Sequence, residues 1–176
     1  VRLAVQRDDL AAAEQWWKKG GFPDLNTPIA LEDYPYHIFE YLALAQSRFM
    51  LARGQETGKM RDLKQAAEWL ETLLSQAERY QRGTSQIQLL ILQAMAQHAL
   101  GNGRATKTLL HALALGEPEG FRRFYLDEGW RLTDLLRQCR AAQEEAGSHL
   151  PSLAFIDSLL ESIEGVDNGQ LVDQVT

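Results

Sequence analysis

Side chains that could perform metal, thiol or acid–base chemistry are few in this sequence and do not stand together. The single cysteine, Cys139, has no partner for an internal disulfide and no histidine at a catalytic or metal-binding spacing. One such cysteine fits a reducing, cytoplasmic location. No His-x-x-x-His spacing occurs among the four histidines, which fall in separate predicted helices: His37, His98, His111 and His149. We therefore expect no metal site.

Two adjacent carboxylate pairs, Asp127–Glu128 and Glu144–Glu145, are the candidates for acid–base catalysis. Such catalysis needs a pair held in unlike environments within one cleft, whereas adjacent carboxylates on a helix point in different directions. We expect both pairs to be solvated. The segment GNGRAT at 101–106 lacks the lysine and the preceding strand of a phosphate-binding loop. Because no catalytic motif is present, the sequence predicts a protein that is not an enzyme.

The stretch GEPEGFRRFYLDEG at 116–129 places two arginines between aromatic residues. One interpretation is an anion-binding site at Arg122 and Arg123. The other is a short helix that starts at Pro118, with both arginines facing water and Arg123 paired with Asp127 one turn later. In that helix one face would pack on the preceding hairpin through the aromatic residues Phe121, Phe124 and Tyr125.

The elements that must position these residues are predicted to be helices. The chain has 176 residues, 45% of them hydrophobic, which suffices for one domain with a core. It is rich in Ala, Leu, Gln and Glu, is interrupted by glycine at intervals, and contains no convincing strand. A first helix is expected to end near Arg7. The later helices are expected at 10–19, 34–53, 62–82, 86–100 and 104–115, and another begins at Trp130.

Capping and helix-breaking residues set these boundaries. Asp8 and Asp9 supply the N-cap of the helix at 10–19, and Thr84 or Ser85 caps the helix at 86–100. The stops are expected at the glycines that follow each helix, namely Gly20, Gly54, Gly83 and Gly101. Short turns between successive helices indicate antiparallel helix hairpins.

Charge and hydropathy argue against several classes of protein. No run of about 18 apolar residues exists, so we expect no membrane-spanning helix. The mixed polar and apolar residues after Val1 do not form a signal peptide, so we expect none. The missing initiator methionine indicates a fragment. The net charge is -6, and every lysine and arginine lies at or before Arg140, which leaves +1 up to that residue and -7 after it. We therefore expect no direct nucleic-acid binding by this chain and no membrane association.

The sequence repeats itself weakly. The pattern DLxxAxxWW at 9–17 matches DLxxAxxWL at 62–70, and a weaker third copy lies at 105–113. Small alanines let two helices approach closely, while a Trp or Leu one turn later fills the groove between hairpins. We accordingly expect Trp16, Trp17 and Trp69 to be packing residues. Because one hairpin cannot bury its apolar face alone, we predict an all-α fold, a superhelical array of antiparallel helix hairpins of the tetratricopeptide-like repeat type.

The segment ALGNGRATKTLLHALALGEPEGFRRFYLDEG at 99–129 resembles the last repeat of the effector-sensing region in large LuxR-type, ATP-dependent transcriptional activators of the MalT-like group. QSRFMLARG at 46–54 resembles the preceding repeat, with Arg48 at the arginine position of the family. The sequence departs from the family in the insertion QETGKMR at 55–61. It departs also at Gln46 and Ser47, where the family usually has Leu and Ala.

The resemblance, which extends over nearly the whole chain, implies a regulator whose N-terminal NTPase domain and C-terminal helix-turn-helix domain lie outside this sequence. GQLVDQVT at 169–176 resembles the segment that precedes the helix-turn-helix. We therefore assign 1–164 to a tetratricopeptide-like domain and 165–176 to an acidic linker. No cofactor is expected here, and ATP is expected in the absent NTPase domain. The implied partners are those two domains and a small-molecule inducer or regulatory protein, with self-association of the full-length protein.

Superhelical arrays usually bind ligands on the concave face, which the first helix of each hairpin lines. Here those helices are 34–53 and 85–100. The candidate effector- or partner-binding residues are the polar and aromatic side chains that interrupt their apolar faces: Tyr36, Glu40, Tyr41, Ser47, Arg48, Gln86, Gln93 and Gln97. The alternative is that the glutamines are solvent-facing helix formers.

Taken together, the sequence predicts a non-enzymatic sensor domain that binds an effector and controls the attached NTPase and DNA-binding domains by population shift. The alternative is a tetratricopeptide-like protein–protein interaction scaffold with no small-molecule ligand. A deep groove with convergent polar groups would favour the sensor, whereas an open and shallow groove lined by Tyr, Gln and Arg would favour the scaffold.

Overall fold

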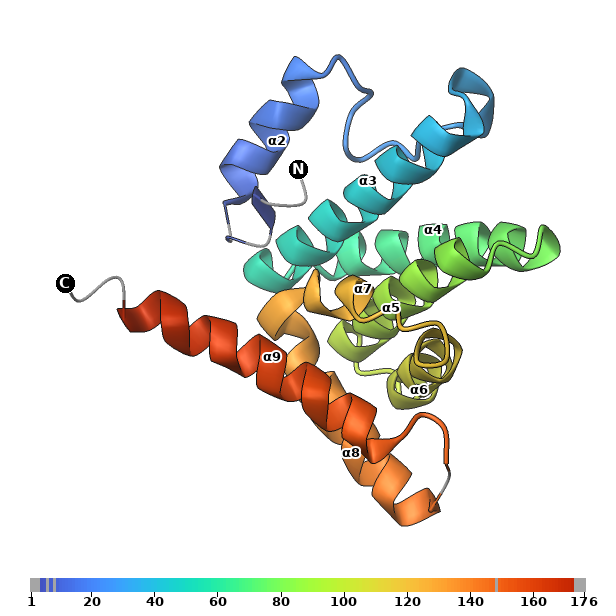
Figure 1. The fold of residues 1–176 in the computed structure, drawn as a ribbon. Coiled ribbons are helices and arrows are strands. Elements are labelled where there is room, and N and C mark those ends of the chain that lie inside the picture. Colours follow the sequence, from blue (N-terminus) through green and yellow to red (C-terminus); the bar gives the residue numbers. More distant parts are fainter. Residues whose placement is uncertain (1–3, 6, 8, 148, 173–176) are drawn as a thin grey trace. The chain divides into compact units, whose positions relative to one another are not determined.

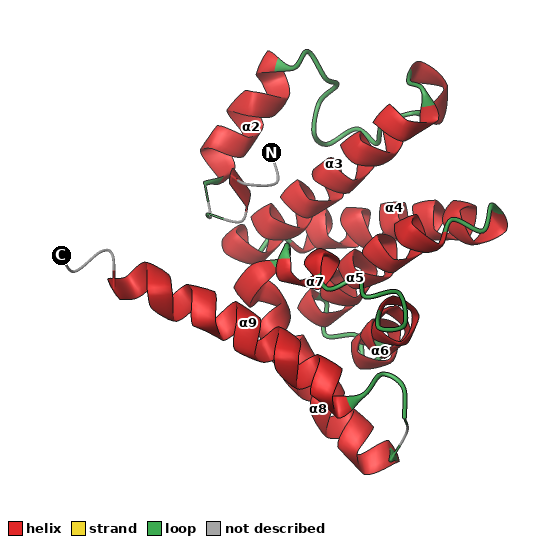
Figure 2. Ribbon diagram, viewed as in Figure 1, coloured by secondary structure: helices red, strands yellow, loops and turns green. Residues whose placement is uncertain are grey.

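The structure, a computed structural model, describes residues 4–5, 7, 9–147 and 149–172. The regular elements of these residues are all helical, and Figure 2 shows no strand among them. The all-α prediction is therefore confirmed. Within the same residues, none of the helices combines the length and the apolar character needed to cross a bilayer.

The helices follow one another along the chain, and the longest connection is the loop between α2 and α3 (Figure 1). In order they are α2 (Leu10–Lys19), η1 (Leu31–Asp33), α3 (Tyr36–Thr57), α4 (Met60–Arg79), α5 (Gly83–Ala99), α6 (Ala105–Gly116), α7 (Arg123–Leu126), η2 (Gly129–Leu132), α8 (Thr133–Ala146) and α9 (Leu153–Val172). The chain divides into two compact units, Val1–Gln76 and Ala77–Thr176.

In the first unit, α2 has the predicted bounds. The Asp9 carboxylate accepts a hydrogen bond from the Ala12 N–H at 2.8 Å, which satisfies one of the free donors at the helix start. Asp8, the other predicted cap, lies outside the described residues. Trp17 is buried and its indole N–H donates to the Pro23 carbonyl. The packing prediction is wrong for Trp16, which is 61% exposed because it lies about 100° around the helix from Trp17.

The hairpin of α3 and α4 differs from the prediction at its turn. Gly54 does not end α3, which continues to Thr57 and ends at Gly58, whose φ is 67°. α4 begins at Met60, before the predicted start at Asp62, and ends at Arg79 instead of Arg82. The insertion at 55–61 therefore lengthens two helices and does not form a long loop. Gly54 has another role, because a Cβ there would lie 2.7 Å from the Leu63 side chain of α4.

The alanine positions of the repeat are buried in both units. Ala13 and Ala66 are 0% exposed, and Ala105 is 3% exposed. The bulky residue one turn later is buried as well in each copy, as Trp17, Leu70 and Leu109. The predicted packing of small and large residues is confirmed at these positions, and it explains how neighbouring helices approach closely.

In the second unit, α5 packs against α6, and α8 packs against both α6 and α9. α5 starts at Gly83, with Arg82 as the capping position and no side-chain cap, so neither Thr84 nor Ser85 is the N-cap. Its end agrees with the prediction. The Gly101 N–H donates to the His98 carbonyl at 2.9 Å and the next N–H to the Gln97 carbonyl at 2.8 Å, a glycine-dependent helix stop.

The predicted helix at Pro118 is absent. Pro118 lies in the turn after α6, and α7 starts only at Arg123. The reason is the buried ring of Tyr125, whose hydroxyl donates to the Ala112 carbonyl of α6 at 2.7 Å and lies against Gly116. The chain must reverse its direction after α6 to place this ring, and a helix from Pro118 would not allow that reversal.

The C-terminal end of the second unit also differs from the prediction. Trp130 lies in the short η2 helix and is 51% exposed. Figure 1 shows α8 and α9 side by side, a contact that forms the last hairpin. α9 continues to Val172 and thus passes the predicted boundary at residue 164, so the first part of the predicted linker is helical.

We predict that Gly54→Ala destabilises the chain although alanine is the better helix former. The new Cβ would meet Leu63, a core residue that is 3% exposed, and such overpacking costs about 1–3 kcal/mol, against a gain of about 1 kcal/mol from helix propensity. Urea unfolding followed by circular dichroism measures the change. Gly165→Ala is the matched control. It lies in α9 with no neighbour within 4 Å of its Cβ position and should raise stability slightly. An unchanged or raised midpoint for Gly54→Ala would contradict the packing role.

Candidate functional site

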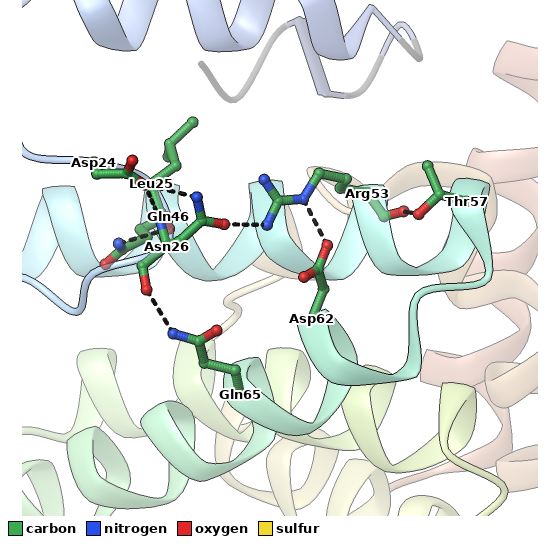
Figure 3. A network of polar contacts seen from close by, with 8 residues as sticks. All are labelled: Asp24, Leu25, Asn26, Gln46, Arg53, Thr57, Asp62 and Gln65. Carbon is green, nitrogen blue, oxygen red and sulfur yellow. Dashed lines mark hydrogen bonds and ion pairs between the residues drawn. The ribbon is translucent and has the colours of Figure 1, made fainter.

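A loop between α2 and α3 is held against α3 by one buried glutamine. The Gln46 side-chain amide donates to the Leu25 carbonyl at 3.0 Å and to the Thr27 carbonyl at 2.7 Å (Figure 3). Gln46 itself is 0% exposed. Because a buried N–H group needs acceptors, these two hydrogen bonds fix the path of the loop. Ser47, the other departure from the family pattern, is buried beside it.

Arg53 extends the same network to α4. Its Nε forms an ion pair with the Asp62 carboxylate at 2.6 Å, and its Nη2 donates to the side-chain oxygen of Asn26 at 2.7 Å. The Gln65 amide donates to the Asn26 carbonyl at 2.6 Å. Figure 3 shows these side chains converging on the loop from both helices. Asn26 therefore ties the loop to α4 and adds a second tie to α3 beside that of Gln46.

Asp24 stabilises the loop through hydrogen bonds within the loop itself. Its carboxylate accepts from both the backbone N–H and the side-chain amide of Asn26, each at 2.7 Å. These hydrogen bonds favour the charged carboxylate and lower the pKa of Asp24 below its ordinary value. The backbone and the side-chain oxygen of Asn26 are thereby oriented towards α4 and Arg53.

The anchored loop borders a groove on the first unit, which we call the α4 groove. It has a volume of about 710 Å³ and is open to solvent. Its lining comes from one face of α4 and from one loop residue: Pro28, Met60, Arg61, Lys64, Gln65, Glu68, Trp69 and Thr72. Gln65 belongs both to this lining and to the loop network, so the network fixes one wall of the groove.

The α4 groove combines apolar and charged side chains. Its apolar part is formed by Trp69, Met60 and Pro28, and Met60 is 48% exposed. The Trp69 ring lies edge-on to Phe39 of α3 at 6.3 Å, and its indole N–H is buried without a hydrogen-bond partner among the described residues. The sequence does not reveal this groove, because a charged helix face with one tryptophan is typical of an ordinary solvated helix.

The predicted site residues of α3 differ in accessibility. Tyr41 is 77% exposed, whereas Tyr36 and Glu40 are half-buried. Ser47 and Arg48 are buried, and the Ser47 hydroxyl donates to a carbonyl of its own helix at 2.8 Å. Of these residues, Tyr41 is therefore the side chain best placed to meet a ligand.

The predicted glutamines of α5 lie in the second unit. Gln93 is buried, so the alternative that it faces solvent is wrong, and its side-chain oxygen has no partner among the described residues. The Gln97 side-chain oxygen accepts from the Thr108 hydroxyl at 2.7 Å, which joins α5 to α6. Gln86 is half-buried. That the residues of α3 and α5 line one binding face stays a prediction.

Arg122 and Arg123 point to different partners. Arg122 donates to the hydroxyls of Ser158 and Ser162 and to the Ser158 carbonyl, all on α9, so the prediction that it faces water is wrong. Arg123 is 78% exposed along its side chain and pairs with Asp127 at 2.7 Å, as predicted. An anion site at the two arginines stays a prediction. An anion bound there would compete with the hydrogen bonds between Arg122 and α9.

The two carboxylate pairs differ in their exposure to solvent. Asp127 and Glu128 are 5% and 8% exposed, so the prediction that they are solvated is wrong, because the reversal of the chain around Tyr125 draws them inward. Glu144 and Glu145 are exposed as predicted. Across the part of the chain that the structure describes, no group of three or more His, Cys, Asp or Glu side chains is placed to hold a metal ion.

We predict that Asp62→Asn loosens the loop and lowers stability. It leaves Arg53 partly buried without its counterion, and a lost hydrogen bond to a charged group costs about 1.5–3 kcal/mol. Thermal unfolding measures the loss, and hydrogen exchange at the amides of Asn26 and Thr27 should become faster. Glu14→Gln, which breaks an exposed ion pair with Lys18, is the control and should change neither measurement. Unchanged loop exchange in Asp62→Asn would show that the ion pair does not hold the loop.

We predict that Cys139 is chemically silent in the folded chain. Its side chain is 0% exposed, and burial raises the pKa of the thiol to about 12, so the reactive thiolate is absent at neutral pH. Titration with Ellman's reagent should detect no thiol in the native protein and one thiol per chain after denaturation. Rapid reaction of the native protein would mean that the α6–α8 interface opens readily.

Comparison with known proteins supplies the identity of the region. A family model described as the MalT-like TPR region matches residues 1–142. Comparisons with curated proteins and with solved structures found no significant match. The matched part includes all of the first unit and extends into α8 of the second. A match that covers more than half of the chain shows that the protein belongs to the MalT-like tetratricopeptide repeat family.

Proposed function

We propose that this chain is the sensing region of a LuxR-type, MalT-like transcriptional regulator. In this role it binds an effector, either a small-molecule inducer or a regulatory protein, and controls attached NTPase and DNA-binding domains. The observation that carries the proposal is the family match over residues 1–142. Such regions are interaction or sensing domains and are typically non-catalytic, so this one binds and does not catalyse. A cytoplasmic location, ATP in the attached NTPase domain and self-association of the full-length regulator belong to the same proposal.

The mechanism is a shift in the population of helix arrangements. An effector changes the equilibrium only through its difference in affinity between two arrangements, and a hundredfold difference corresponds to about 2.7 kcal/mol. Small buried residues such as Ala66 and Ala105 let helices pack at short distance, and such contacts could be rearranged within each unit. An effector that prefers one packing of these helices would favour the active form of the regulator.

A second candidate function is a protein-interaction scaffold without a small-molecule ligand. It is favoured by the α4 groove, which is open and has one helix face as its main wall. Small ligands are usually buried over some 70–90% of their surface, and an open groove of this kind suits a segment of another protein better.

We predict that an effector stabilises the chain measurably. A ligand at about a hundred times its Kd adds about 2.7 kcal/mol, which raises Tm by roughly 5–10 °C in a protein of this size. Thermal-shift curves with a panel of sugars, nucleotides and short peptides measure this. A sugar or nucleotide that raises Tm favours the sensor, and a response to peptides alone favours the scaffold. Flat curves throughout the panel would argue against effector binding by this region.

The regulator context has its own test in the gene. If the proposal is correct, the reading frame encodes a P-loop NTPase domain before this region and a helix-turn-helix domain after it. A reading frame without these two domains would refute the regulator and leave only the interaction domain.

A further inference from the structure

Two cations in the α4 groove have no counterion among the residues that the structure describes. Arg61 and Lys64 are exposed, stand three residues apart on α4, and form no ion pair with any described residue. Glu68 lies one turn after Lys64, yet the two side chains form no ion pair either. The other charged pair near the groove, Arg53 and Asp62, is already neutralised internally. The groove therefore carries more positive than negative charge, in a chain whose net charge is -6.

An apolar surface lies on the same helix face. Trp69 follows Arg61 by about two turns, and Met60 and Pro28 complete the apolar lining. Tryptophan and arginine are the residues that most often dominate the binding energy of protein interfaces. The buried indole N–H of Trp69 has no acceptor among the described residues, so it is free to donate to a carbonyl or carboxylate of a bound segment if the ring moves.

We propose that the α4 groove is a docking site for an acidic segment of a partner protein that carries an apolar side chain. The carboxylates would pair with Arg61 and Lys64 while the apolar side chain packs on Trp69. This inference rests on the proposed interaction function and names its partner chemistry. It uses a face of α4, the second helix of a hairpin, whereas the predicted site residues lie on the first helices. The anchored loop gives the groove a rigid wall, which lowers the entropic cost of binding.

The charge of the occupant follows from the lining. A basic segment would meet two unpaired cations at the groove, and like charges there oppose association. Nucleic acid would meet a chain of net charge -6, with only these two cations in the groove to hold phosphates. An acidic peptide needs no more than the two charges present, because its apolar side chain supplies the remaining affinity.

The test starts from an unbiased peptide library. A random library displayed on phage is selected on the whole chain, and the enriched sequences are made as labelled soluble peptides for fluorescence anisotropy. We expect enrichment of Asp and Glu beside Leu, Phe or Trp. Binding should weaken as salt concentration rises. The indole N–H signal of Trp69, assigned in NMR spectra with Trp69→Phe, should shift when peptide is added.

Charge reversal locates the site. Arg61→Glu with Lys64→Glu should weaken peptide binding about tenfold or more, because two attractions become repulsions. The fold should be preserved, since both residues are exposed near the start of α4, where acidic side chains are favourable. The matched control is Arg104→Glu with Lys107→Glu, the same residue types at the same spacing and exposed at the start of α6. It should leave binding within about twofold.

Several outcomes would overturn the docking site. They are a failure to enrich peptides, enriched peptides without acidic residues, equal binding by the groove variant and its control, or displacement of the peptide by duplex DNA held through the same two cations. If the thermal-shift panel still identifies an effector, the proposed sensing function survives and only the groove assignment is lost.

Discussion

The close approach of helices at small side chains is the constraint on which the rest of this structure depends. Ala66 and Ala105 are almost completely buried, and each allows a neighbouring helix to come near enough for a bulky residue one turn later to fill the groove. Gly54 and Gly116 carry this further, since each lies against the side chain of another helix where no Cβ would fit. Helices can pair where these small residues lie, and the positions of the turns depend on that pairing.

Buried polar residues have structural roles that the sequence pattern does not predict. Gln46 occupies a buried position of α3 and satisfies two carbonyls of the preceding loop. Arg53 joins the same loop to α4 through Asn26 and Asp62. A buried amide or guanidinium without partners would be costly, so these contacts make the loop path specific. The loop in turn supports one wall of the α4 groove.

This arrangement separates two kinds of surface in the molecule. The predicted site residues of α3 are partly used for packing, as the buried Ser47 shows, while Tyr41 stays accessible. The α4 groove instead gathers unpaired charge and apolar area at one place. A repeat region of the MalT-like family that serves as an interaction domain needs such accessible and chemically mixed surfaces, because its packed alanines and leucines are buried.

The sequence by itself determined the helical class, the helix end at Gly101, the Asp9 cap and the alanines that face inward. These features depend on residues a few positions apart, whose local preferences and periodicity are readable in one dimension. Only the tertiary structure decided that Gly54 lies inside a helix, that Arg122 binds α9, and that Asp127 and Glu128 are buried. It alone brought Pro28 beside Trp69 to form a groove. Each of these features depends on a contact between residues distant in sequence. Where the free energy gained by such a contact exceeds the local preference for a helix end or for an exposed charge, the contact decides the structure.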